Sequence, residues 1–102
     1  MIVRDAAGFR VQGPITMNNV EALLEEGRRL FAEPEVSVDL SAVSEVDSTA
    51  VSLLLQWRRD AAGRGQRLTF CNLTPNIQSL AALYGVTDLI PVAPPGAGGV
   101  VS

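Results

Sequence analysis

Two adjacent hydroxyl side chains, Ser48 and Thr49, follow the carboxylate of Asp47 at the point where a short apolar run leads into a helical pattern. A hydroxyl at a helix start can cap the free backbone N–H groups of the first turn, which stabilises the helix by about 1 kcal/mol. It can also accept a phosphate, because negative charge is favourable at the positive end of a helix dipole. Capping is the commoner role, and the residues alone leave both open.

The predicted helix that starts at Ser48 carries a mostly uncharged polar strip on the side opposite its apolar residues. Small polar side chains allow a partner to approach closely, so this strip is either a protein-binding surface or an ordinary solvent-exposed face. Ser48 is the candidate phosphoacceptor. The candidate partner-binding residues are Asp47, Ser48, Thr49, Ser52, Gln56 and Arg59.

Other reactive side chains give weaker signals. Asp39 and Asp47 could in principle share a divalent metal or act as an acid–base pair, but each stands where a carboxylate usually accepts backbone N–H groups. Cys71 is the only cysteine and lies in an apolar, strand-like run, so we expect it in the core. The chain has no histidine, which removes the usual general base and most zinc sites. We therefore predict no catalytic residue, no metal site and no cofactor.

Composition limits the classes of function further. With 102 residues, of which 47% are hydrophobic, the chain can form one domain with a real core. Its eight cationic residues are all arginine, and the net charge of -3 with no long basic run argues against nucleic-acid binding. No segment approaches the roughly 20 apolar residues of a membrane span, and the N-terminus lacks signal-peptide features. We expect a cytoplasmic protein.

Periodicity and capping signals predict a mixed sheet of four to five strands with about three helices, packed mainly on one face. An opening hairpin is expected at residues 2–4 and 9–12, with later strands at 36–40, 68–71 and an edge strand at 89–92. Helices should run from a cap at Thr16 or Asn18 to before Pro34, from 48 to about 62 with closing glycines at 63 and 65, and from 75 to 84. In the last helix, we expect Ile77, Leu80, Ala81 and Tyr84 to face inward. Residues 1–93 form the predicted domain, and the Pro/Gly-rich residues 94–102 a flexible tail.

The segments 38–43 and 46–50, which read Val-Asp-Leu-Ser-Ala-Val and Val-Asp-Ser-Thr-Ala, resemble the signature of STAS domains. The similarity extends over nearly the whole predicted domain, including the 13–16 turn, Gly65 and the third helix. In that family, the first hydroxyl after the aspartate is the position that anti-sigma kinases phosphorylate, and Ser48 matches it. Ala50 stands where the family usually has glycine, and Val51 where it often has leucine.

Residues 80–86, together with 53–55 and Trp57, are most similar to the MlaB group of STAS domains. These are small subunits of the bacterial MlaFEDB phospholipid ABC transporter. The resemblance implies a non-catalytic subunit that binds the MlaF-like ATPase through a contact including Ser48, and reaches the membrane permease through that ATPase. The alternative is an anti-sigma factor antagonist whose partner is a serine kinase and which is switched by phosphorylation of Ser48.

Overall fold

The computed structural model describes residues 1–6 and 8–92. The predicted tail at 94–102 and the predicted domain end at residue 93 lie outside these residues, so both remain predictions. Within the described residues, no helix is long and apolar enough to cross a membrane. The elements in chain order are β1 (Ile2–Asp5), β2 (Gly8–Val11), β3 (Gly13–Ile15), α1 (Val20–Leu30), β4 (Glu35–Asp39), β5 (Val43–Val46), α2 (Ser48–Arg64), β6 (Arg67–Cys71), α3 (Pro75–Leu83) and the short 3-10 turn η1 (Thr87–Leu89).

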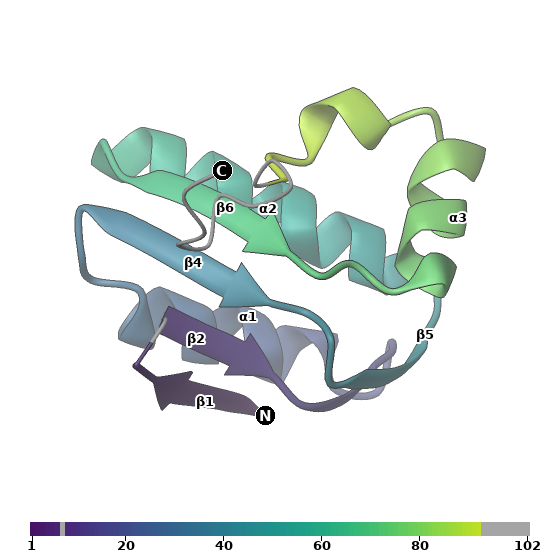
Figure 1. Cartoon of the computed structure of the whole chain (residues 1–102), viewed down its shortest axis with the longest axis horizontal. Helices are drawn as coiled ribbons and strands as arrows, with labels where there is room; N and C mark the ends of the chain where they lie inside the picture. Colours follow the sequence, from purple (N-terminus) through teal and green to yellow (C-terminus); the bar gives the residue numbers. More distant parts are fainter. Residues whose placement is uncertain (7, 93–102) are drawn as a thin grey trace, which may run out of the picture.

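The main sheet has the strand order β1-β2-β4-β6. β1 and β2 form the predicted antiparallel hairpin, whereas β2, β4 and β6 run parallel to one another. Helices α1 and α2 lie side by side on one face of this sheet, and α3 lies beyond the end at which the parallel strands finish (Figure 1). The expected mixed α/β fold with helices mainly on one face is therefore confirmed.

Strands β3 and β5 form a second, two-stranded parallel sheet that the sequence did not predict. Each is only three or four residues long, so neither shows a readable alternation of apolar and polar side chains. Their pairing is nevertheless important for the site. It fixes the loops that lead into α1 and α2, because the Asp47 N–H donates to the Ile15 carbonyl of β3 at 3.2 Å.

Some predicted helix ends are correct and others are wrong. Thr74 caps α3 with its side chain, and Gly65 ends α2 in the left-handed conformation with φ 71°. Gly63 does not close α2, which continues to Arg64. The N-cap of α1 is Asn19 rather than Thr16 or Asn18, and the Asn19 side chain turns back to accept the Thr16 N–H.

The core lies between the helices and the covered face of the sheet. Trp57 of α2 is 2% exposed and packs edge-on against Phe31, with ring centroids 5.1 Å apart. Helix α1 approaches closely enough that a side chain at Gly27 would meet the Trp57 ring, since an added Cβ would lie 2.4 Å from the indole nitrogen. Glycine at this position therefore allows the two helices to pack together.

Three predictions about burial or strand structure need correction. Cys71 is half-buried rather than in the core, since its neighbours Phe70 and Leu68 take the covered face of β6. Tyr84 is 54% exposed, because it caps the end of α3 instead of continuing its inward face. The expected strand at 89–92 is reduced to a single parallel bridge between Val92 and Phe70.

Candidate functional site

The start of α2 is held by the carboxylate of Asp47. Its Oδ1 accepts the Thr49 N–H at 2.9 Å and also the Thr49 hydroxyl, while its Oδ2 accepts the Met17 N–H at 2.9 Å. The hydrogen bond from the Thr49 hydroxyl is the largest cause that holds the pKa of Asp47 below its usual value, and the Met17 N–H adds to it. Asp47 and Thr49 therefore form the N-cap, and their polar groups are committed to the fold.

Ser48 has a different setting from its neighbour. It is exposed at the first position of α2, and Ser52 and Arg59 are exposed further along the same helix. Because they follow at steps close to whole helical turns, the three side chains share one outward face. Gln56 leaves this face: it is half-buried, and its amide donates to Asp60 Oδ1 at 3.0 Å.

A groove that the sequence did not predict lies beside Ser48, between α2 and the end of α3. We call it the α2–α3 groove. Its volume is about 410 Å3. Val51, 4% exposed, is its most buried lining residue, and the exposed Tyr84 and half-buried Val86 line it from the α3 side. Its lining residues are Ser48, Thr49, Val51, Ser52, Leu55, Tyr84 and Val86.

The groove escaped sequence reasoning because Tyr84 was assigned to the inward face of the last helix, and because Leu55 follows two buried leucines. Leu55 is only half-buried, since it lies at the boundary between the apolar and polar sides of α2. A partial signal was available in Gly85, whose φ of 68° turns the chain directly after Tyr84. Because the helix ends at Tyr84, the tyrosine ring does not continue the inward-facing row of side chains formed by the residues before it.

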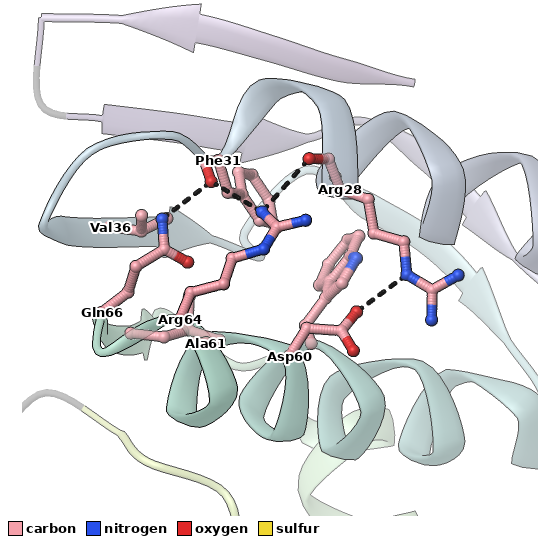
Figure 2. Close-up of a pocket in the computed structure, with 10 residues that line it drawn as sticks. Arg28, Phe31, Val36, Asp60, Ala61, Arg64 and Gln66 are labelled. Atoms are coloured by element: carbon pink, nitrogen blue, oxygen red, sulfur yellow. Dashed lines mark hydrogen bonds and ion pairs between the residues drawn. The ribbon is translucent and has the colours of Figure 1, made fainter.

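The opposite end of α2 is closed against α1, as Figure 2 shows. Asp60 accepts the Arg28 Nε–H at 2.9 Å, and Arg64 donates to the carbonyls of Arg28 and Phe31, each at 3.3 Å. Gln66 adds a donor to the Phe31 carbonyl at 2.8 Å. These donors occupy carbonyl groups that the end of α1 would otherwise leave unpaired. We call this the closed end of α2.

The pKa of Asp60 reflects this pairing. Burial opposes ionisation of its carboxyl, yet the hydrogen bonds from Arg28 and Gln56 outweigh burial and hold the pKa below its usual value. The same ion pair raises the pKa of Arg28, chiefly through its hydrogen bond to Asp60. Arg28 and Arg64, the arginines of the closed end, are thus already engaged within the fold.

Asp39 and Cys71, which were considered above for other chemistry, interact with the backbone and side chains around them. Asp39 accepts the Ser41 N–H at 2.8 Å, and although burial opposes its ionisation, this bond and the Asn72 side chain lower its pKa. Burial is the main cause that raises the pKa of the Cys71 thiol, which makes its thiolate scarce at neutral pH. Among the described residues, no group of three or more acidic, cysteine or histidine side chains could hold a metal ion.

Comparison with known proteins agrees with this fold. A profile of the family described as "Mlab, STAS domain" matches residues 2–91. Among solved structures, the chain is similar to the anti-sigma factor antagonist SpoIIAA in its unphosphorylated form, with a TM-score of 0.68 and 18% identity over 93% of this chain and 88% of that one. It is also similar to a sulfate transporter family protein from Wolinella succinogenes, with a TM-score of 0.63 and 14% identity over 84% of this chain and 73% of that one. No curated protein matches the chain by sequence.

Proposed function

The chain belongs to the STAS domain family, and from this premise we propose that it is a non-catalytic subunit of a bacterial phospholipid ABC transporter. In this proposal, it binds and supports the transporter's ATPase subunit, and the complex maintains the lipid asymmetry of the outer membrane. STAS domains are generally non-catalytic binding modules. The observation that carries the proposal is the match of residues 2–91 to the Mlab type of STAS domain.

The surface around Ser48 supports a role in protein binding. Ser48, Ser52 and Arg59 share an exposed helix face, and the α2–α3 groove adds an apolar surface beside it. Exposed Tyr84 is of a residue type enriched at protein interfaces. We therefore assign the ATPase contact to this face, with the subunit cytoplasmic and held at the inner membrane through the ATPase and the permease.

Co-purification tests the proposal directly. The tagged full chain is expressed at native level in its own cells, and co-purifying proteins and the Ser48 peptide are identified by mass spectrometry. Recovery of an ABC ATPase with its permease, together with unmodified Ser48, is the expected result. Recovery of a serine kinase, or of phosphorylated Ser48, would overturn it in favour of the anti-sigma antagonist.

A single substitution then assigns the contact. Ser48→Glu should reduce ATPase recovery at least about tenfold, because it would bury an unpaired charge in the interface. The fold should tolerate this change, since an acidic side chain in the first turn is favourable to the helix dipole. The matched control is Ala62→Glu, which adds the same charge to an exposed position of the same helix, about 21 Å away at a rise of about 1.5 Å per residue. Equal recovery with both variants would remove Ser48 from the contact.

A further inference from the structure

The charges of the molecule are unevenly divided between the two ends of α2. Six of the eight arginines lie in the C-terminal halves of α1 and α2 or at the start of β6. By contrast, residues 43–57 and 74–92, which contain every lining residue of the α2–α3 groove, include no arginine or lysine. Their charged residues are Glu45, Asp47 and Asp88. The segments that line the groove therefore carry acidic residues as their charged groups.

Two of these carboxylates are available to a partner. Glu45 and Asp88 are exposed, and neither forms an ion pair with another described residue. Asp47 keeps its charge within the N-cap, where it offsets the positive end of the α2 dipole. Glu45 precedes the lining residue Ser48 by three positions and Asp88 follows Val86 by two, so both exposed carboxylates adjoin the groove along the chain.

The groove itself is suited to an apolar side chain. Val51, Leu55, Tyr84 and Val86 supply apolar groups, and its volume of about 410 Å3 exceeds that of any single side chain. The hydroxyls of Ser48 and Ser52 lie along its rim. An apolar group seated here would be surrounded by small polar residues, which is the arrangement of a central anchor with a polar rim.

We propose that the α2–α3 groove receives a segment of the partner that presents one large apolar side chain and, within about one helical turn of it, an arginine or lysine facing Glu45 or Asp88. This inference rests on the proposed function, since the partner segment is assigned to the ATPase subunit. The apolar side chain supplies most of the affinity. The cation selects the partner and speeds association, because opposite charges steer the encounter.

Site-specific crosslinking identifies the segment in contact with the groove. A benzophenone side chain replaces Ser52 on the groove rim, and a control chain carries it at Glu35, an exposed residue at the far end of the sheet. Light-induced adducts in the chain's own cells are digested and sequenced. The expected adduct at position 52 is an ATPase peptide that contains a large apolar residue and an arginine or lysine.

The outcomes separate this inference from the proposed function. An ATPase peptide without such residues would overturn the inference and leave the ATPase as partner. A peptide of the expected chemistry from a different protein would support the groove chemistry and overturn the assignment to an ATPase. Absence of any adduct at position 52, while co-purification still recovers the ATPase, would place the contact elsewhere and overturn the inference alone.

Charge reversal gives a second readout. Glu45→Arg combined with Asp88→Arg should weaken ATPase binding at least about tenfold near 0.1 M salt, and the loss should shrink as salt is raised to about 1 M. The control, Glu35→Arg, should change binding less than about twofold, because Glu35 lies away from the groove. An unchanged affinity in the double variant would contradict the cationic part of the inference.

Discussion

Helix α2 carries polar side chains at both ends, but they serve different purposes. At the closed end, Asp60 and Arg64 bind to α1, and the large side chain of Trp57 is buried. At the other end, the hydroxyls of Ser48 and Ser52 are exposed beside the α2–α3 groove. The difference shows that polar residues on one helix can complete the fold at one end and remain available to a partner at the other.

The helix that packs against each end of α2 determines whether the polar residues there stabilise the fold or stay exposed to a partner. Helix α1 runs beside the closed end, and Gly27 lets it approach to contact distance of Trp57. Helix α3 packs its buried residues Ile77 and Ala81 into the core, and Tyr84 and Val86 at and beyond its end line the groove without covering it. Substitutions at the closed end should therefore change stability, and those at the open end should change binding.

The largest effect is expected from Trp57→Ala, which should lower the free energy of unfolding by about 3–5 kcal/mol. The reason is the cavity left among Phe31, Phe70 and Gly27, which the indole now fills. Urea denaturation followed by circular dichroism measures the change. The exposed neighbour Arg58 supplies the control, since Arg58→Ala should shift stability by no more than about 0.5 kcal/mol. A loss below about 1 kcal/mol for Trp57→Ala would contradict the central role of the closed end.

A smaller effect is expected from acidification. The folded-state pKa of Asp60 lies below the ordinary aspartate value of about 3.9, so the stability that its ionised form contributes is present above about pH 4 and is lost as pH falls through the folded-state pKa. Asp60→Asn should lower stability at neutral pH by about 1 kcal/mol, because the pair is partly exposed to solvent, and should flatten this part of the pH profile.

The partner of Asp60 provides the matching test. Arg28→Gln should flatten the same part of the pH profile, and Asp60→Asn should then have little further effect, because the two residues act as a pair. Arg29→Gln is the control, since the adjacent Arg29 is exposed and forms no ion pair with any other residue the structure describes. Fully additive effects of Asp60→Asn and Arg28→Gln would show that the ion pair does not contribute.

Much of the fold could be predicted because its elements carry strong local signals. Thr74 followed by Pro75 marks the start of α3, and the apolar alternation of β4 and β6 marks two neighbouring parallel strands of the sheet. The strands β3 and β5 could not be predicted, because each is too short to show a pattern and exists only through its pairing with the other. The N-cap of α1 was missed because Thr16, Asn18 and Asn19 are all of residue types that cap helices, and the helix begins only after the last of them.

The exposed residues on one face of α2 could be predicted from the sequence, but the groove between α2 and the end of α3 could not. Spacing placed Ser48, Ser52 and Arg59 on one face of α2, and the structure keeps them there. Spacing also placed Gln56 on that face, but the carboxyl group of Asp60 draws its amide toward α1. The groove depends on where α3 ends relative to α2, which the sequence of α2 alone does not contain.

The smallest expected effects come from the adjacent hydroxyls of Ser48 and Thr49 at the start of α2. Substitutions there should separate the residue that stabilises the helix start from the residue that contacts the partner. Thr49→Val removes the hydroxyl that donates to Asp47 while keeping the shape of the side chain, so it should lower the free energy of unfolding by about 0.5–1.5 kcal/mol. Ser48→Ala removes an exposed hydroxyl, so it should change stability by less than about 0.5 kcal/mol.

Binding should respond in the opposite order. Ser48→Ala should weaken ATPase binding by about two- to tenfold, because it removes an exposed hydroxyl from the proposed contact. Thr49→Val should weaken binding less, because the Thr49 hydroxyl is already bound to Asp47 and valine keeps the shape of this groove-lining side chain. Calorimetric titration of the purified ATPase with each variant, paired with urea denaturation, measures both quantities on the same samples. If Ser48→Ala instead destabilises the fold as much as Thr49→Val does, the two hydroxyls share the capping role, and the assignment of Ser48 to the ATPase contact fails.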